Sequence, residues 1–141
     1  MKKSLHIVLL LCVCLIVGCV APQSFVKSLD PTWASVELRD EVTAEQAWQV
    51  VVDTLVKQFD LEVLSKENGY LRTNWQYTWT GRLNERYRVR VTAKFSPDKK
   101  KLEMKSEAEF GGAGYWVQGY DTRLLSTLKT DIMGSIGRTT R

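Results

Sequence analysis

Apolar and polar residues alternate with a period of two along three stretches in the middle of the chain. In 86–95 apolar side chains alternate mainly with cations, and in 101–110 they alternate mainly with lysines and glutamates. The stretch 71–79 alternates mostly aromatic with polar residues. Successive side chains of a strand point to opposite faces of a sheet, so this period predicts strands with one covered and one solvated face. A shorter stretch, 61–66, adds a fourth strand.

The alternation assigns each strand residue to a face of the predicted antiparallel sheet. In 61–66 the assignment depends on the turn: a two-residue turn would cover Glu62 and Lys66, whereas a loop 67–69 with a left-handed Gly69 covers the apolar positions and is preferred. The aromatic row of 71–79 is assigned to the core, with a glycan or lipid pocket as the alternative. The predicted covered positions are Leu61, Val63, Ser65, Leu71, Thr73, Trp75, Tyr77, Trp79, Tyr87, Val89, Val91, Ala93, Phe95, Leu102, Met104, Ser106, Ala108 and Phe110.

Charges on the solvated face predict the register of the last two strands. Placing Phe95 opposite Leu102 unites three oppositely charged pairs: Lys94 with Glu103, Arg90 with Glu107, and Arg88 with Glu109. A slip of one residue would turn the whole apolar row to water. We therefore interpret Arg86, Arg88 and Arg90 mainly as a paired strand face, with an anion site as the alternative.

Two helices flank the predicted strands. Thr43 and Gln46 match a capping box, which predicts a helix that ends near Phe59. Asp121 caps a second helix, whose apolar residues recur at helical spacing: Leu125, Leu128, Ile132 and Ile136. The order predicts an α+β two-layer domain, a four-stranded antiparallel meander with both helices on one face, as in helix-grip folds.

Two segments outside these elements are candidates for binding. The stretch 111–119 combines four glycines with Tyr115 and Trp116, which suits contact with a protein, a glycan or a bilayer. It equally suits a connection whose aromatic side chains tuck against the domain. The stretch 19–41 carries Phe25, Trp33, Val36 and Leu38. Either Trp33–Leu38 docks on the domain or the arm binds a partner in extended form.

The composition excludes several kinds of catalytic site. The chain has 141 residues, 44% of them hydrophobic and 26% charged, which fits one globular domain. Its three cysteines and its one histidine all lie within residues 1–19. If residues 1–18 are removed, no His-dependent nucleophile, His/Cys metal site or internal disulfide is possible. Glu107 and Glu109 have glycosidase-like spacing, but cationic neighbours favour their ionised forms. We expect no enzyme activity, cofactor or metal.

Residues 1–18 have the pattern of a secretory signal. Lys2 and Lys3 precede an apolar stretch, 5–17, that as a helix would cover about 20 Å, too short for a hydrocarbon core. The following Ile16–Cys19 resembles the lipobox of bacterial lipoproteins. The alternatives are ordinary cleavage after Ala21 and a plain apolar helix. Removing 1–18 takes away two lysines, so the formal net charge of +4 falls to +2, and we expect no nucleic-acid partner.

The lipobox resemblance implies that Cys19 is acylated, that 19–41 is a lipidated arm, and that 42–138 is the α+β domain. Val20 rather than Asp after the cysteine implies the outer membrane, facing the periplasm. This layout resembles the C subunit of the outer-membrane β-barrel assembly machinery, which has two helix-grip domains where this chain has room for one. The resemblance implies an accessory subunit without enzyme activity. Its candidate partner-binding residues are Phe25, Trp33, Tyr115 and Trp116. The alternative is a carrier of a small apolar or glycan ligand between the sheet and the second helix.

Overall fold

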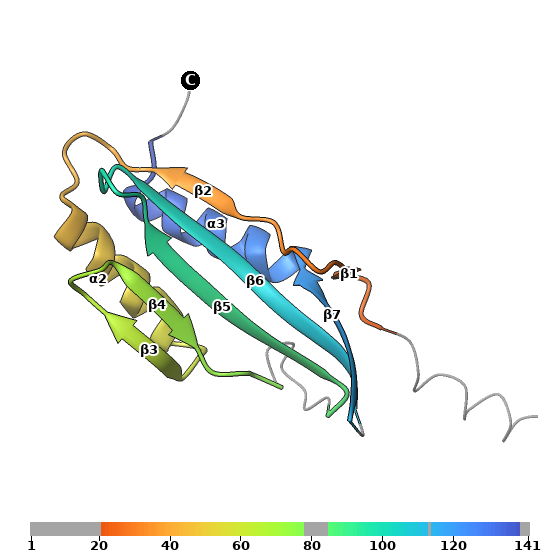
Figure 1. The fold of residues 1–141 in the computed structure, drawn as a ribbon. Coiled ribbons are helices and arrows are strands. Elements are labelled where there is room, and N and C mark those ends of the chain that lie inside the picture. The colour runs from red at the N-terminus through yellow and green to blue at the C-terminus, as the bar shows by residue number, and fades with distance from the viewer. Residues whose placement is uncertain (1–20, 78–84, 113, 139–141) are drawn as a thin grey trace, which may run out of the picture.

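The computed structural model describes residues 21–77, 85–112 and 114–138. Within these residues it is an α+β domain with two helices and a seven-stranded antiparallel sheet (Figure 1). The strand order is β1-β7-β6-β5-β4-β3, and β2 pairs with β6 outside this path. The elements are β1 (Phe25–Lys27), β2 (Ala34–Glu37), α2 (Ala44–Val56), β3 (Leu61–Ser65), β4 (Tyr70–Thr73), β5 (Tyr87–Phe95), β6 (Lys101–Gly112), β7 (Tyr115–Asp121) and α3 (Thr122–Ile136).

Both helices begin at the predicted caps. The Thr43 side chain accepts a hydrogen bond from the Gln46 backbone N–H, and the Gln46 side chain accepts one from the Thr43 backbone N–H, so the capping box is confirmed. Asp121 caps α3 by accepting from the Leu124 N–H at 2.8 Å. Helix α2 ends at Val56, earlier than predicted, although Phe59 is still buried.

The register predicted from charge is confirmed. Phe95 lies opposite Leu102 in the β5–β6 ladder, and the three predicted ion pairs form across it. Lys94 Nζ lies 3.3 Å from Glu103 Oε2, Arg90 Nε 3.1 Å from Glu107 Oε2, and Arg88 Nε 2.7 Å from Glu109 Oε2. The apolar residues of both strands consequently face the helices together.

The sheet has seven strands in place of the predicted four because three strands form in segments without alternation. Strand β7 replaces the connection expected at 111–119. Gly112 pairs directly with Tyr115, and positive φ angles at Gly112 (120°) and Gly114 (84°) let the chain reverse there. Strands β1 and β2 come from the arm, which docks on the sheet in this structure.

Strands β7 and β2 share one edge of β6. β7 pairs with the half of β6 that follows Ser106, and β2 pairs with the half that precedes Lys105. Between them, the buried Ser106 hydroxyl donates to the Asp121 carbonyl at 2.8 Å and accepts from the Asp121 N–H at 3.1 Å. Ser106 can therefore be buried on the covered face, because it satisfies the Asp121 backbone groups at the point where β6 changes its pairing from β2 to β7.

The face assignment of the aromatic row is wrong for its described members. Arg72 pairs with Thr92, so a regular ladder would place Gln76 opposite Arg88, but Gln76 pairs with Val89. One extra residue therefore lies in this segment, and such a slip reverses the faces. Trp75 and Tyr77 consequently contact arginines on the face without helices. Trp79 lies outside the described residues.

A second irregularity changes β3. Gly69 has the predicted left-handed conformation (φ 56°), and Leu61 lies opposite Thr73 on the covered face. A bulge between Leu61 and Val63 then places Val63 opposite Arg72 and turns it, with Ser65, away from the helices, contrary to prediction. Leu64 takes their place opposite Leu71 but remains 52% exposed at the sheet edge.

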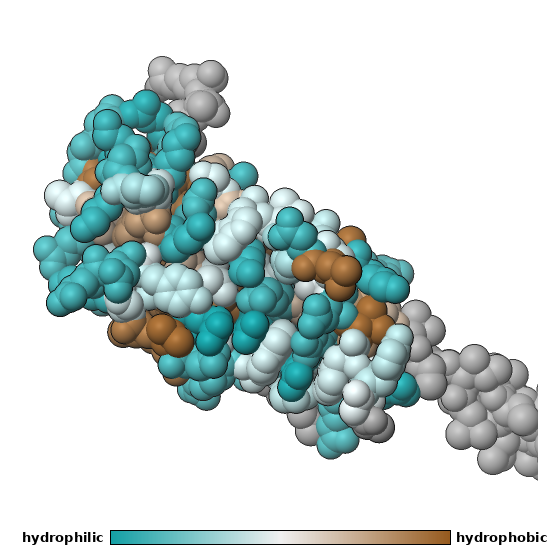
Figure 2. Space-filling view, viewed as in Figure 1, coloured by the Kyte–Doolittle hydropathy of each residue, from teal (hydrophilic) through white to brown (hydrophobic). Residues whose placement is uncertain are grey.

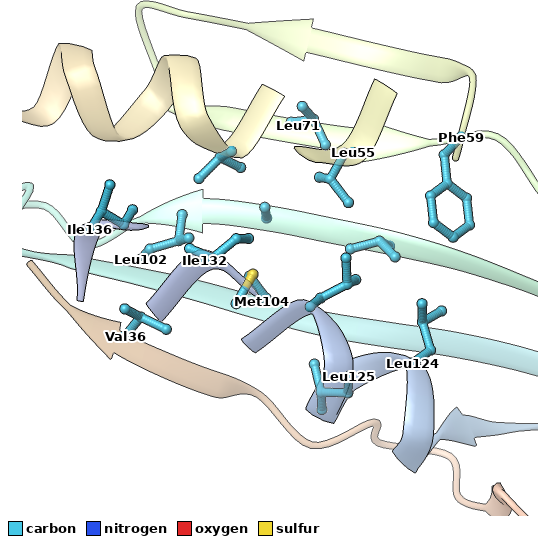
Figure 3. Packing of buried hydrophobic residues seen from close by; sticks show 14 of the residues in the cluster. Val36, Leu55, Phe59, Leu71, Leu102, Met104, Leu124, Leu125, Ile132 and Ile136 are labelled. Atoms are coloured by element: carbon cyan, nitrogen blue, oxygen red, sulfur yellow. The ribbon is translucent and has the colours of Figure 1, made fainter. Parts of the chain in front are cut away.

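The core fills the space between the sheet and the two helices, which lie together behind the sheet in Figure 1. Figure 3 shows Ile132 of α3 beside Leu102 and Met104 of β6, and Leu55 of α2 belongs to the same core cluster. Leu128 of α3 is also in this core, with 1% of its surface exposed. Neither helix of the described residues lies on the opposite face of the sheet, hereafter the open face.

The buried Asp121 carboxylate connects the arm to the core. Its Oδ1 caps α3, and its Oδ2 accepts hydrogen bonds from the Ser24 hydroxyl at 2.7 Å and from the Tyr87 hydroxyl. Burial of Tyr87, followed by its hydrogen bond to Asp121 and the charge of that carboxylate, raises the pKa of Tyr87 far above its usual range. Tyr87 therefore stays a neutral donor in the folded protein.

Replacing Tyr87 by Phe tests this contact. Losing a hydrogen bond to a buried carboxylate costs about 1.5–3 kcal/mol, so Tyr87→Phe is expected to lower the free energy of unfolding by this amount in urea denaturation at pH 7. Tyr70→Phe, at a half-buried tyrosine of β4, is the control and should cost less than about 0.5 kcal/mol. Equal losses for the two variants would contradict the assigned role of Asp121.

The same pair predicts an alkaline signature. The pKa of Tyr87 is raised by folding, so its contribution is complete below the unfolded pKa of about 10 and declines as the pH rises above it. The stability gap between wild type and Tyr87→Phe should narrow by up to about 1.4 kcal/mol per pH unit above pH 10. A gap that stays constant to pH 11.5 would show that Tyr87 ionises normally in the fold.

Candidate binding surface on the open face

Aromatic rings and charged side chains interleave across the open face. We call this set the aromatic–cation surface. Its members are Trp33, Trp75, Tyr77, Trp116, Arg88, Arg90, Lys94, Lys105, Glu103, Glu107 and Glu109. In Figure 2, the side of the molecule toward the viewer is mostly teal and pale, and brown is confined to separate patches.

Arg88 holds together tryptophans from two distant segments. Its guanidinium carbon lies 4.3 Å from the ring centre of Trp116 on β7 and 4.7 Å from that of Trp75, which follows β4. Arg88 also donates a hydrogen bond to the Tyr77 hydroxyl at 3.0 Å. The guanidinium carbon of Arg90 lies 4.5 Å from the centre of the Trp75 ring. Planar guanidinium groups stack on indoles in this way, so the rings are fixed by the cations of β5.

Trp33 extends the surface toward the other end of β5. This residue directly precedes β2, and its ring centre lies 4.5 Å from Lys94 Nζ and 5.3 Å from Lys105 Nζ. Trp33 remains 38% exposed. Because a strand rises about 3.4 Å per residue, the distance along β5 from Arg88 to Lys94 is about 20 Å. The surface therefore matches a peptide segment or several sugar rings in length.

Each cation of this surface lies near a carboxylate. Arg90 makes two hydrogen bonds to Glu107, both 3.1 Å long. Burial of Glu107 by itself raises its pKa, but Arg90, Lys105 and Thr92 outweigh burial and hold the pKa below the usual range. A general acid needs the opposite shift, so Glu107 does not have the environment of one. The paired arginines likewise favour the strand-face interpretation over an anion site.

A shallow hollow of about 90 Å³ opens on this surface. It is lined by Trp75, Arg90 and Glu107 from the sheet and by Ser28, Leu29 and Pro31 from the connection between β1 and β2. An aromatic ring beside a paired guanidinium and carboxylate offers both a stacking face and hydrogen-bonding groups. The hollow thus suits a planar or ring-shaped polar group.

A larger hollow, of about 370 Å³, lies at the turn between β5 and β6, where Lys99, Lys100 and Arg138 are among its lining residues. Its acidic residues already have partners. Lys101 Nζ lies 3.2 Å from Glu37 Oε1, Arg138 pairs with Asp40, and Asp98 accepts from the Lys100 N–H. No aromatic ring lines this hollow, so it is a weaker candidate than the aromatic–cation surface.

The four residues proposed from the sequence as partner-binding occupy three different environments. Trp33 and Trp116 belong to the aromatic–cation surface. Tyr115 begins β7 beside the hairpin turn and is 73% exposed. Phe25 is half-buried, and its ring meets the Tyr87 ring edge-on at 6.0 Å between centres. Cys19 lies outside the described residues.

Sequence reasoning missed Trp75, Tyr77 and the cations beneath them as one site. The alternation is unbroken from Leu71 to Trp79, so nothing in the pattern marks the extra residue that turns the ring of Trp75 outward. The stacking of Arg88 between Trp75 and Trp116 also joins residues far apart in the chain. The available signal was the cluster of three arginines in 86–90 beside an aromatic row.

Comparison with protein-family models and with curated proteins finds no match to this chain. Across the described ranges, no helix is both long and apolar enough to cross a membrane. The same residues contain no group of three or more His, Cys, Asp or Glu side chains placed to hold a metal ion.

A double-mutant cycle tests whether Arg88 and Trp116 interact. A cation–π contact at a partly exposed site is worth about 0.5–1 kcal/mol, so Arg88→Met and Trp116→Leu should show a coupling energy of this size in urea denaturation. Arg72→Met with Trp116→Leu provides the control cycle, because β5 and β6 separate Arg72 on β4 from Trp116 on β7. A coupling near zero for Arg88 and Trp116 would contradict the stacking geometry.

Proposed function

We propose that the protein is a lipid-anchored accessory subunit of an envelope complex, without enzyme activity, held at the outer membrane by acylated Cys19 and facing the periplasm. We further propose that its partner is an envelope protein that binds the aromatic–cation surface. The single observation that supports this role is the set of three tryptophans fixed by cations on the sheet face opposite α2 and α3.

Pre-positioned aromatic residues are effective binding groups. Trp, Tyr and Arg are the residue types most enriched where protein interfaces gain their binding energy. Trp75 and Trp116 are already held by Arg88, so binding would immobilise few additional side chains. Their partial exposure leaves ring surface available to a partner.

The paired charges indicate how a partner would be recognised. Arg88, Arg90 and Lys94 each have a carboxylate within 3.3 Å, so little unbalanced charge remains on this part of the surface. Binding there would rely on stacking, burial and hydrogen bonds and would depend only weakly on salt concentration. We also propose that the domain has a helix-grip arrangement. In such an arrangement the helices pack on one face of the sheet and leave the other face for binding.

A glycan on the same surface is the second candidate. The hollow beside Trp75 favours it, because sugar rings stack on indoles and hydrogen-bond to groups such as Arg90 and Glu107. A carrier site inside the domain has no such support. Leu128 lies in the filled core, whereas Trp75 lies across the sheet on the open face, so the two cannot line one cavity.

Photo-crosslinking in cells tests the partner. A photoreactive residue replaces Gln118, an exposed residue of β7 that borders the hollow, and in a matched strain it replaces Gln58, exposed just after α2. A discrete protein adduct is expected from position 118 and not from position 58. Crosslinking at position 33 should give the same adduct, because Trp33 belongs to the same surface.

The adduct from position 118 should also weaken when Trp75 is replaced by Ser at unchanged protein level. Glycan adducts in place of a protein would favour the second candidate. Equal products from positions 118 and 58, or none from position 118, would overturn the proposal that the aromatic–cation surface binds a partner.

A further inference from the structure

The arm is already attached to the domain at Ser24, only a few residues along the chain from Cys19. The Ser24 hydroxyl donates a hydrogen bond to the Asp121 carboxylate, and the Ser24 carbonyl accepts one from the Thr122 N–H at 2.9 Å. From Phe25 onward the chain is strand β1, paired with β7. A chain that pairs with the sheet from residue 25 onward cannot act as a flexible spacer over 19–41.

Gly119 allows this close approach. A Cβ atom at Gly119 would lie 2.2 Å from the Val26 carbonyl oxygen and 2.6 Å from the Phe25 ring, both too short for any side chain. The backbone of β1 and the ring of Phe25 therefore occupy the space that a side chain on β7 would need. Any larger residue at position 119 would force β1 away from the sheet.

The few residues between Cys19 and Ser24 limit how far the domain can stand from a bilayer. Ser24 is the fifth residue after Cys19. A fully extended chain spans at most about 3.6 Å per residue, which gives about 18 Å between the acylated residue and the first fixed one. The edge of the sheet that begins at Phe25 would then lie within about 18 Å of the headgroups.

This edge exposes aliphatic side chains within the distance of the bilayer that the short chain from Cys19 allows. Val26 is 38% exposed and Leu29 is 89% exposed, the highest value among the large hydrophobic residues of the described ranges. Lys27 between them is also exposed. Apolar groups flanked by a lysine suit the boundary between acyl chains and headgroups.

We propose that Val26, Lys27 and Leu29, the β1 edge, rest on the lipid bilayer and fix the orientation of the domain. This inference depends on the proposed acylation of Cys19. Two aliphatic side chains and one ammonium group are too few to bind a membrane alone, but the acyl anchor holds them at high local concentration. The anchor then supplies the attachment, and the β1 edge supplies the orientation.

The orientation narrows the class of partner. Leu29 lines the hollow beside Trp75, so the aromatic–cation surface starts next to the bilayer. The β5–β6 turn lies farther away, because Lys101 is seven residues along β6 from Ala108, the residue level with β1, which is about 24 Å. A partner that covers this surface is therefore an integral outer-membrane protein or a domain held against the membrane.

Single-cysteine labelling tests the orientation. The chain has no cysteine after Cys19, so Leu29→Cys and Leu64→Cys each give one reactive thiol in the acylated protein. Leu64 is the matched control, a leucine exposed on β3 at the opposite edge of the sheet. Each variant carries an environment-sensitive fluorophore and is reconstituted in vesicles of phosphatidylethanolamine and phosphatidylglycerol.

The probe at position 29 should be quenched by nitroxide lipids and protected from iodide, and the probe at position 64 should behave in the opposite way. Adding Gly119→Val should release β1 and make position 29 accessible to iodide while the protein still floats with the vesicles. Equal iodide access at both positions in floating protein would overturn the orientation and leave the proposed function standing. Protein that fails to float would overturn the acylation, and with it both proposals.

Discussion

The buried carboxylate of Asp121 is the interaction on which the arrangement of this domain depends. It caps α3 through Leu124, accepts from Tyr87 of β5, and binds Ser24 of the arm, while the backbone of the same residue bonds to Ser106 of β6. A buried charge is tolerated only when it is paired or fully hydrogen-bonded, so these donors must be present together. Sheet, helix and arm are therefore connected at one residue.

Much of the fold follows from local pattern. Alternation predicts β3, β5 and β6, the capping residues predict both helix starts, and three charge pairs predict the β5–β6 register. Strands β1 and β2 could not be predicted in this way, because their pairing depends on contacts between distant segments. Strand β7 pairs with the preceding β6 through a tight hairpin, but its glycine-containing sequence lacks the alternation that marks a strand. Gly119 resembles a loop signal in the sequence, yet its role is to admit Phe25 and the backbone of β1.

The candidate site was predictable only in part, for a geometric reason. Trp33 and Trp116 could be proposed because they lie in segments without a core pattern. Trp75 lies within a regular alternation, and only the pairing of Gln76 with Val89 reveals the extra residue that moves its ring to the open face. A period of two fixes relative faces within a strand but says nothing about a slip between strands.

The same carboxylate also links stability to any function of the open face. The connection that carries Leu29 and Trp33 is held at one end by β1, which begins next to the Ser24–Asp121 bond, and at the other by β2. If β1 leaves the sheet, the hollow beside Trp75 loses one wall and Trp33 loses a fixed approach to Lys94 and Lys105. Ordering of the arm therefore completes the hollow and the Trp33 end of the aromatic–cation surface, so a change at the buried carboxylate would alter any binding there without touching the open face.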